Sequence, residues 1–407
     1  MSPRRRRRAV LGALAIAVPV ALVVAGLTGS SPHAPTPRAS SAPTSTVATP
    51  SSTTTSSAAP GPLLPARPAP RTEQFGASVN LLFNSGDHTP DQIAAQLRAL
   101  RASGVTTARS DAFWEASEPA APVNGVHSYD WAFDDKIIAA LATAGLRWLP
   151  ILDYSAPWAQ SITGQDHSPP SSADAYAAYA AAFAARYGSG GSFWRNHPEL
   201  APEPVGAYEI WNEPDNGEFW TPTPDPARYA DLYLAARRAI DLADPAARVI
   251  VGGLTNPTAF VPAMLRARPQ LSGHVDGVGI HPYGSPEVVL AKTRADRAML
   301  VDQGLSSVPM YVTEFGWTTS PPGALDYAAP PRRMTYIQQT LTALGHLNCG
   351  LASALLYTWY SPQENPADSQ QWYGLVGPGA VPTPAAAAFT RGLQAAHAPT
   401  PTLSLCG

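Results

Sequence analysis

The sequence predicts an α/β fold, and within that class a single-domain (β/α)8 TIM barrel. After Gln74, short apolar runs of β type alternate with amphipathic helical stretches, and this alternation occurs eight times. The apolar runs are nearly continuous, which is typical of parallel strands covered by helices. The predicted strands are Phe75–Leu82, Thr106–Ser110, Arg147–Leu152, Val205–Trp211, Arg248–Gly252, Val275–His281, Met310–Glu314 and Ala352–Trp359.

The segments between these strands carry helix patterns. An open, doubly wound sheet is the alternative arrangement of such units, but it is expected to carry a glycine-rich phosphate-binding turn after its first strand. No such turn follows the first strand here, so closure into a barrel is preferred. The predicted helices include Pro90–Ser103, Phe133–Ala144, Ala173–Tyr187, Pro226–Ala243, Pro286–Gln303, Arg332–Leu347 and Pro384–His397.

The N-terminal segment, residues 1–27, reads as an export signal or an N-terminal membrane anchor. Arg4–Arg8 precede an apolar run of 19 residues, Ala9–Leu27. A basic stretch before an apolar one is typical of export signals, and 19 residues are also enough to span a bilayer. Either reading predicts an extracytoplasmic protein, secreted or anchored to the membrane.

The next segment, residues 28–70, consists almost wholly of Ser, Thr, Pro and Ala and predicts a disordered linker. Such a composition cannot bury enough apolar surface to offset the entropy lost on ordering. The barrel is then expected to occupy residues 71–398, with residues 399–407 as a C-terminal tail.

The charge distribution excludes one class of partner. Residues 1–70 hold seven arginines and no acidic residue, so residues 71–407 keep 20 basic residues against 30 acidic ones, a net charge of −10. Phosphate backbones are bound by clustered Lys and Arg, so nucleic acid is not an expected partner.

The two cysteines, Cys349 and Cys406, match neither a C-x-x-C redox pair nor a zinc-ligand spacing. In an exported protein they are expected to form a disulfide that pins the tail to the end of a late helix. Two unrelated buried thiols are the alternative. No other spacing suggests a metal site, and neither a metal nor a cofactor is expected.

Two glutamates stand at strand ends. Glu213 follows the fourth predicted strand and Glu314 closes the seventh, so both belong at the C-terminal mouth of a barrel, where the chemistry of this fold resides. Paired carboxylates across a cleft can cleave a glycosidic bond, since one protonates the leaving oxygen and the other attacks the sugar.

The segments Trp211–Pro214 and Thr313–Gly316 resemble motifs of clan A glycoside hydrolases, and the closest pattern is family 39. That family includes β-xylosidases, α-L-iduronidases and bacterial exopolysaccharide glycosidases. The resemblance spans the eight-unit region and implies that Glu213 is the general acid/base and Glu314 the nucleophile. One departure is Asp153, which ends strand three where some clan members have a histidine.

The same resemblance suggests supporting residues. Asn212 corresponds to the clan asparagine that binds the sugar 2-hydroxyl, with a capping role as the alternative. Arg109, which ends strand two, corresponds to the arginine beside the nucleophile, and an ion pair with Glu209 is the other reading. Tyr283 corresponds to a tyrosine that bonds the nucleophile, and His281 is expected either to position its neighbours or to be a core residue.

Tryptophans cluster after the predicted strand ends. Packing is the default role of aromatic residues, but rings near the mouth can also stack on sugar faces. Trp359 is expected to be the sugar platform after strand eight, followed by a cis peptide as in the clan. The candidate platforms are Trp114, Trp158, Trp220, Trp317, Trp359 and Trp372.

These patterns predict a retaining glycoside hydrolase that cleaves a poly- or oligosaccharide through a covalent glycosyl-enzyme. The carbohydrate substrate is the one partner expected. A non-catalytic glycan-binding surface protein on a barrel scaffold is the alternative, and it would not need both glutamates. Neither a Gly-x-Ser-x-Gly elbow nor a His-Glu-x-x-His zinc motif is present to favour an unrelated hydrolase.

Overall fold

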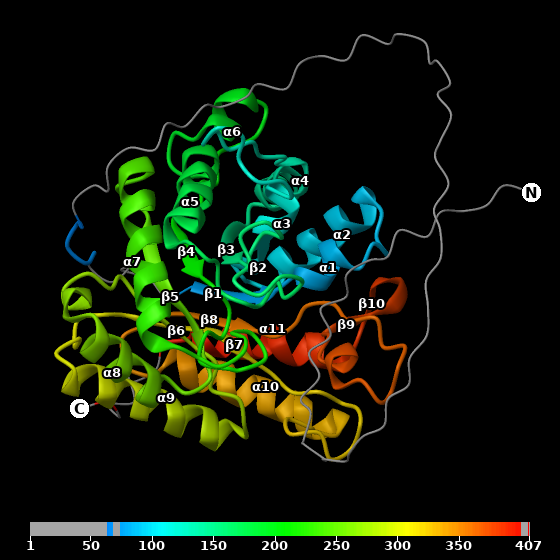
Figure 1. Ribbon diagram of the computed structural model, residues 1–407. Helices are drawn as coiled ribbons and strands as arrows, with labels where there is room; N and C mark the ends of the chain where they lie inside the picture. Colours follow the sequence, from blue (N-terminus) through cyan, green and yellow to red (C-terminus); the bar gives the residue numbers. More distant parts are fainter. Residues whose placement is uncertain (1–62, 68–73, 400–405, 407) are drawn as a thin grey trace, which may run out of the picture.

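The computed structural model describes residues 63–67, 74–399 and 406, and its centre is a closed parallel β-barrel (Figure 1). Eight strands follow one another around the barrel in chain order, and β8 pairs with β1 to close it. The predicted (β/α)8 barrel is therefore confirmed. The strands are β1 (Gln74–Ser78), β2 (Thr107–Phe113), β3 (Arg147–Asp153), β4 (Ala207–Ile210), β5 (Arg248–Leu254), β6 (Val278–Ile280), β7 (Met310–Phe315) and β8 (Leu351–Leu356).

Helices surround the barrel in the ribbon of Figure 1. Short polar side chains cap the N-termini of several of these helices. The hydroxyl of Ser172 accepts a hydrogen bond from the backbone NH of Ala175 at the start of α5, and Thr89 and Gln92 form a capping box on α2. The α-helices are α1 (Asn80–Asn84), α2 (Pro90–Ala102), α3 (Trp114–Ser117), α4 (Ala132–Thr143), α5 (Ala173–Tyr187), α6 (Ser192–Asn196), α7 (Pro226–Ala243), α8 (Pro257–Ala267), α9 (Pro286–Asp302), α10 (Pro330–Gly345) and α11 (Pro384–Ala396).

Three short 3-10 turns and a two-stranded sheet complete the described elements: η1 (Pro269–Leu271), η2 (Ser369–Trp372), η3 (Pro378–Ala380), β9 (Val376–Gly377) and β10 (Val381–Pro382). The latter two strands pair antiparallel. They follow β8 and lie on the chain between the barrel and α11.

Two layers of apolar side chains hold the barrel. The larger layer packs between the strands and the surrounding helices, and a small one fills the barrel interior. The interior layer does not extend to the mouth, where charged side chains take over. Its buried members are Leu149, Ile250, Tyr311, Ala352 and Leu355.

Strand ends differ from the sequence prediction at several points that matter for the mouth. β2 continues three residues past Ser110 to Phe113, whereas β8 stops at Leu356 rather than Trp359. β1 stops at Ser78, and the chain turns at once into α1. Polar inward-facing residues hid the end of β2, whereas β1 and β8 were predicted too long because apolar residues continue past the last residue of each strand.

Residues 63–67 lie against the barrel, although the sequence predicted them as part of the linker. The guanidinium of Arg67 forms ion pairs with Asp241 at 2.6 Å and Asp276 at 2.8 Å. The backbone NH of Ala66 donates to the carbonyl of Gly273. The linker prediction of 28–70 is wrong for this stretch, because buried acids of the barrel bind its arginine. The remaining linker and the N-terminal segment lie outside the described residues.

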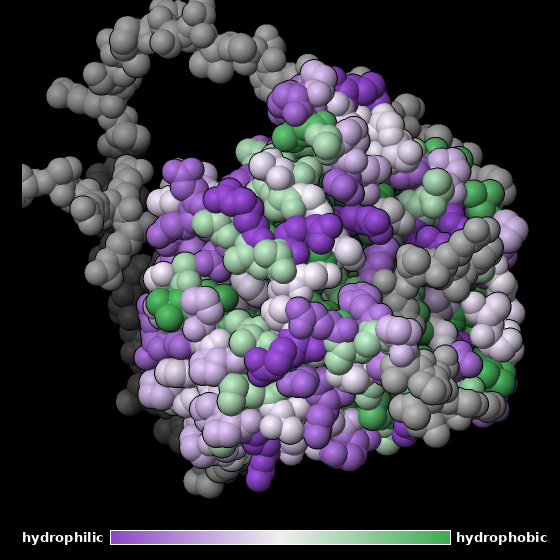
Figure 2. Space-filling view, turned by 180° about the vertical axis from the view of Figure 1, so that it is seen from behind, coloured by the Kyte–Doolittle hydropathy of each residue, from purple (hydrophilic) through white to green (hydrophobic). Residues whose placement is uncertain are grey.

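Cys349 and Cys406 form the predicted disulfide, with their Cα atoms 5.2 Å apart. It joins residue 406 of the tail to the chain just after α10. Within the described residues, no helix combines the length and the apolar character needed to cross a membrane. The face seen in Figure 2 mixes hydrophilic and hydrophobic residues, and its hydrophobic patches are small and separate.

Candidate active site

Glu213 sits in a tight turn directly after β4. Trp211 and Glu213 both adopt left-handed backbone conformations, with φ of 67° and 44°. Such residues cost about 1–3 kcal/mol each and persist where the surroundings fix them. The indole NH of Trp211 donates to the carbonyl of Phe219 at 2.7 Å, and the NH of Glu213 donates to the carbonyl of Gly253 at 3.0 Å. The turn thereby holds the Glu213 side chain at the barrel mouth.

Glu314 lies in β7 and is held by two donors. Arg109 Nη1 donates to Oε1 at 2.6 Å, and the Tyr283 hydroxyl donates to Oε2 at 2.7 Å. Burial alone would raise the pKa of this carboxyl, but the charges of His281 and Arg109 and the two hydrogen bonds outweigh it. The pKa of Glu314 therefore lies below its usual range, and the group is ionised near neutrality.

Arg109 is fully buried and binds more than one acid. Its Nε and Nη2 donate to the carboxylate of Glu209 at 2.7 and 3.1 Å, and Nη2 also donates to Asn212 Oδ1 at 3.0 Å. Burial alone would lower the pKa of the guanidinium, but the two carboxylates raise it. The sequence suggested two roles for Arg109, a place beside Glu314 and an ion pair with Glu209, and the structure shows both.

His281, at the end of β6, lies between the two glutamates. Its Nδ1 is 2.7 Å from Glu213 Oε1 and 3.8 Å from Glu314 Oε2, and its Nε2 is 3.1 Å from the Thr313 hydroxyl. Burial would lower the pKa of the imidazole, but the charge of Glu314 and the contact with Glu213 raise it above its usual value. A Cβ on Gly253 would lie 2.0 Å from Nε2, so this position must be glycine for the ring to fit.

One carboxylate oxygen of Glu213, one of Glu314 and a ring nitrogen of His281 all lie within 4.8 Å of one another. In the described part of the chain, this is the one cluster of three such side chains close enough to hold a metal ion. The oxygens of Glu314 already accept from Arg109 and Tyr283, however. A guanidinium beside the carboxylate opposes a bound cation, so the donor set does not fit a metal well.

A cavity of about 170 Å³ opens beside His281, over the ends of β5 and β6. Asp296 and Lys292 of α9 line it together with Thr255 and Asn256. Burial raises the pKa of Asp296 to about 7, opposed by Lys292. Leu254, Pro257 and Pro282 also line the cavity, so polar and apolar side chains share its wall.

Most of the predicted sugar platforms are core residues. Trp114, Trp220, Trp317 and Trp359 are all at most 4% exposed, and the indole NH of Trp359 donates to Gln96 at 3.0 Å. The prediction that these four stack on substrate is wrong, because their faces are covered by protein. Trp158 and Trp372 remain partly exposed.

Tyr357 stands where the platform was expected. It is the first residue after β8, it is partly exposed, and its ring lies 5.3 Å from that of Tyr373. Burial and the charge of Glu314 raise the pKa of its hydroxyl. The cis peptide also follows Tyr357 and not Trp359. In this fold the residue directly after a strand often lies at the site. With the true end of β8 at Leu356, this rule selects Tyr357 in place of Trp359.

Asn216 and Asp111 are two further polar residues of the mouth that the sequence did not single out. Asn216 Nδ2 donates to Glu213 Oε2 at 2.8 Å, and Asp111 lies in β2 two residues beyond Arg109. Asn216 follows the turn that carries Glu213, and no sequence motif identifies it as a site residue. Asp111 directly follows the predicted end of β2, but no motif of the resemblance includes it.

Comparison with known proteins bears on the fold. No protein-family model and no curated protein match the chain. Among solved structures, the family 39 β-xylosidase of Caulobacter crescentus is 22% identical, with a TM-score of 0.59, over 80% of this chain and 72% of that one. The family 39 glycoside hydrolase of Xanthomonas axonopodis pv. citri is 20% identical, with a TM-score of 0.60, over 80% and 67%.

A family 5 enzyme of Streptomyces cattleya, solved with N-acetylglucosamine, has a TM-score of 0.60 at 16% identity, over 81% of this chain and 82% of its own. The resemblance that the motifs indicated is thus present at the level of the fold. This chain is a (β/α)8 barrel of the kind on which these glycoside hydrolases are built. At such low identity the likeness establishes the fold and not the activity.

Proposed function

We propose that the protein is a retaining glycoside hydrolase, with Glu314 as nucleophile and Glu213 as general acid/base. The observation that carries the proposal is the facing pair of glutamates from β4 and β7, with carboxylate oxygens within 4.8 Å of each other. Retaining enzymes hold their carboxyl groups about 5–5.5 Å apart, whereas inverting enzymes leave about 6.5–9.5 Å for a water.

The first step uses the ionised state of Glu314. Its oxygen attacks the anomeric carbon while the bond from that carbon to the leaving oxygen breaks, and Glu213 gives its proton to that oxygen. The product is a glycosyl ester of Glu314. In the second step a water attacks the anomeric carbon and loses its proton to Glu213, and the ester bond breaks to free Glu314.

His281 supports the proton on Glu213. The Thr313 hydroxyl lies 3.2 Å from a Glu209 oxygen and donates to it, so its own oxygen accepts from His281 Nε2–H. The Nδ1 atom then faces Glu213, and the two groups share one proton. His281 can therefore exchange a proton with Glu213 both when the glycosyl ester forms and when water hydrolyses it.

Asn212 is proposed to bind the sugar 2-hydroxyl. Its Oδ1 accepts from Arg109, which leaves the amide NH2 directed to other acceptors. A hydrogen bond to that hydroxyl strengthens as the transition state forms. Arg109 and Tyr283 then act on Glu314 and not on the sugar.

The non-catalytic alternative loses support from the same side chains. A glycan-binding surface needs exposed aromatic rings, and four of the six candidate tryptophans are buried. A binding protein would also have no use for a buried arginine that keeps Glu314 ionised. We further propose that the enzyme acts outside the cytoplasm, secreted or held at the membrane by residues 1–27, on a poly- or oligosaccharide.

A reducing-sugar screen on xylan, glucan, mannan and bacterial exopolysaccharides tests the activity. Glu314→Gln and Glu213→Gln serve as matched controls that separate true turnover from a contaminant. NMR of the first-formed product should show the anomer of the substrate. Release of the opposite anomer would rule out the retaining mechanism, and no turnover of any glycan would contradict the assignment as a glycosidase.

A further inference from the structure

The side-chain amide of Asn216 contacts the carboxyl group of Glu213. Its Nδ2 donates to Glu213 Oε2 at 2.8 Å. The other end of the amide fixes its orientation, because the backbone NH of Glu218 donates to Asn216 Oδ1 at 3.1 Å. A turned amide would set its NH2 group against that NH and its oxygen against Oε2, so both bonds would be lost. Glu213 Oε2 therefore faces a hydrogen-bond donor.

The backbone of Asn216 is held on both sides. Its NH donates to the carbonyl of Glu213 at 2.9 Å, and its carbonyl accepts from the backbone NH groups of Phe219 and Trp220 at 3.0 and 2.9 Å. Asp215 fastens the same turn to the loop after β5, since its carboxylate accepts from two backbone NH groups there, at 3.1 and 2.5 Å. The amide of Asn216 is therefore aimed at Glu213 before any substrate arrives.

Glu213 Oε1 faces a group of the opposite kind. His281 Nδ1 lies 2.7 Å from it, and Nε2–H of the same ring donates to the hydroxyl of Thr313. In a neutral imidazole with its hydrogen on Nε2, Nδ1 is an acceptor. A proton on Oε1 can therefore be donated to the ring, while Oε2, as the carbonyl oxygen, keeps its bond from Asn216. A proton on Oε2 would weaken that bond and leave Nδ1 without a donor.

We infer that Asn216 is a positioning residue that directs the acid proton of Glu213 to Oε1. This inference rests on the proposed glycosidase function and deepens it, since it names the oxygen that protonates the leaving group. In the first step the Oε1–H bond breaks, the proton bonds to the leaving oxygen, and the electron pair of the broken bond stays on Glu213. In the second step the attacking water gives a proton back to Oε1. The bond from Asn216 keeps the carboxyl from turning over and exchanging its two oxygens.

Charged side chains from several elements lie around the Glu213 carboxyl. His281 contacts it, and an oxygen of Glu314 lies within 4.8 Å of one of its own. Arg109 bonds Glu314 from the other side. Burial raises the pKa of Asp215 in the same turn, and the charge of Glu213 adds to the rise. The amide that touches Oε2 is neutral, so replacing it with an acid adds one negative charge to this set.

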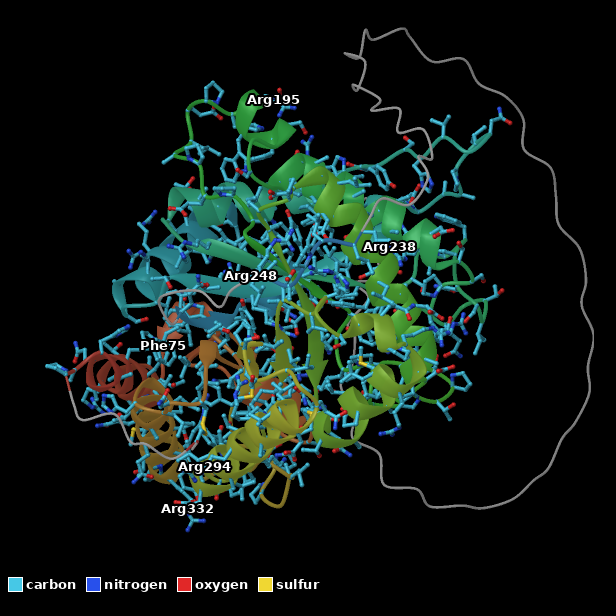
Figure 3. The ribbon with its side chains drawn as sticks, turned by 90° about the vertical axis from the view of Figure 1, so that its left-hand side faces the viewer. Phe75, Arg195, Arg238, Arg248, Arg294 and Arg332 are labelled. Carbon is cyan, nitrogen blue, oxygen red and sulfur yellow. A yellow bond between two sulfur atoms is a disulfide. The ribbon has the colours of Figure 1, made fainter. Side chains whose placement is uncertain are left out.

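Remote charges have little effect on this carboxyl. Figure 3 shows Arg195 and Arg332 at opposite edges of the molecule, far from the barrel centre, and both are exposed. Exposed charges at such separations are largely screened by salt. A change of the pH profile on replacement of Asn216 therefore reports the local groups.

Asn216→Asp tests the inference, because it keeps the shape of the side chain and the acceptor for the backbone NH of Glu218. It replaces the donor that faces Glu213 Oε2 with a second carboxylate oxygen, so two acceptors face each other and draw the acid proton to Oε2, away from Oε1. Asn365→Asp is the matched control. Asn365 Oδ1 likewise accepts from the backbone NH two residues further along, that of Ala367, and the side chain is exposed in the loop after β8.

Two leaving groups separate a loss of acid catalysis from a loss of structure. The probes are phenyl and dinitrophenyl glycosides of xylose, glucose and mannose, since phenol needs the proton and dinitrophenol departs without it. Asn216→Asp should lower kcat/KM at least about tenfold for the phenyl glycoside and less than about twofold for the dinitrophenyl glycoside. The basic limb of the pH profile of kcat/KM should move to higher pH, because a neighbouring negative charge makes the proton harder to remove. Asn365→Asp should change neither.

The outcomes separate the two proposals. Equal losses for the two glycosides, or no loss in Asn216→Asp, overturn the inference and leave the glycosidase function standing. If the unaltered enzyme hydrolyses neither these glycosides nor any glycan of the screen, the glycosidase function fails. NMR titration of labelled glutamate carboxyl carbons, with Glu213→Gln to identify the signal, then decides the inference: a midpoint raised in Asn216→Asp supports it, and an unchanged midpoint overturns it. Should Asn216→Asp fail to fold by circular dichroism, Asn216→Ala, which removes the donor and adds no charge, carries the same leaving-group test.

Discussion

The guanidinium of Arg109 lies 2.6 Å from the carboxylate of Glu314. Arg109 is fully buried and Glu314 is 7% exposed, so water cannot replace either partner of this ion pair. Breaking a buried pair of this kind costs about 3–5 kcal/mol, since the remaining charge stays without compensation. The charges of His281 and Arg109 together keep the pKa of Glu314 low. Arg109 therefore couples the fold of β2 to the ionisation of a residue in β7.

Arg109→Lys should reduce kcat/KM by at least about a hundredfold, because one ammonium cannot replace a fork that serves Glu209 and Glu314 together. The pKa of Glu314 should rise, so the acid limb of the pH profile of kcat/KM should move to higher pH. Arg98→Lys, an exposed change on α2, is the control. An unmoved acid limb would contradict the proposed role.

Removal of divalent metals should leave activity unchanged. The two oxygens of Glu314 accept from Arg109 and Tyr283, so a metal at the Glu213, His281 and Glu314 cluster would face a neighbouring positive charge. The measurement is kcat/KM before and after dialysis against EDTA, with metal content determined in parallel. Loss of activity that a divalent ion restores would show that this cluster binds a catalytic metal.

Tyr357 and Trp359 should respond differently to substitution. Tyr357→Ala should lower kcat/KM roughly 3- to 10-fold through loss of a partly exposed aromatic ring at the end of β8, with little change in Tm. Trp359→Phe should leave KM unchanged but destabilise the fold by about 1–3 kcal/mol, since Gln96 loses its buried donor. If KM instead changes only when Trp359 is replaced, Trp359 would be the sugar platform, as the sequence predicted.

The barrel and its glutamate pair could be predicted because both depend on order along the chain. Alternating apolar strands and helices leave a countable pattern, and in this fold any residue at a strand's C-terminal end reaches the mouth. Glu213 and Glu314 satisfy that rule whether or not the strand ends are exact. Asn212, Arg109 and Tyr283 were predicted from the resemblance to clan A motifs, and the structure places Arg109 and Tyr283 at hydrogen-bond distance from Glu314.

The burial of the tryptophans and the place of Asp111 within β2 could not be predicted, for a physical reason. A ring that packs in a core and a ring that stacks on sugar are the same residue type, so Trp359 and Tyr357 could be told apart only by the true end of β8. The prediction ended β2 before the charged Asp111, although the strand continues to Phe113. Charged residues that face inward at the barrel mouth break the apolar pattern from which a strand is predicted.

Asp134, on α4, should make stability depend on pH. Its side chain is fully buried, Ser117 donates to one oxygen at 2.8 Å and the other has no partner, and burial raises its pKa to about 7. The protonated form is favoured in the folded state, so its stabilising contribution is complete below about pH 4 and is lost as the pH rises through about 7.

Asp134→Asn removes this titration and keeps the shape of the side chain. Relative to the unaltered protein, its free energy of unfolding should rise between pH 4 and pH 7, by at most about 4 kcal/mol, because each tenfold change in proton binding is worth about 1.4 kcal/mol. Urea unfolding at a series of pH values measures the difference. The exposed change Asp302→Asn should show no such trend, and a constant difference for Asp134→Asn would refute the explanation.

The roles of the two glutamates should separate in their variants, because a nucleophile and an acid/base fail differently when truncated. Glu314→Ala should abolish hydrolysis of every substrate, since no glycosyl ester can form. Glu213→Ala should still form the ester from a substrate with a good leaving group such as dinitrophenol, which departs without a proton. Release of the sugar should then be slow for want of a base, and a burst of dinitrophenol should precede the steady state.

Azide distinguishes the two roles by the anomer it yields. In Glu213→Ala the small anion attacks the glycosyl ester from the side that the acid/base has vacated, so the glycosyl azide keeps the configuration of the substrate. In Glu314→Ala azide takes the place of the carboxylate and attacks the substrate directly, so the product has the opposite configuration. NMR of the two azide products reads both configurations at once. Swapped configurations would reverse the assignment of the two glutamates, and full activity in either variant would remove that residue from the mechanism, because neither step can proceed at its normal rate without its carboxyl group.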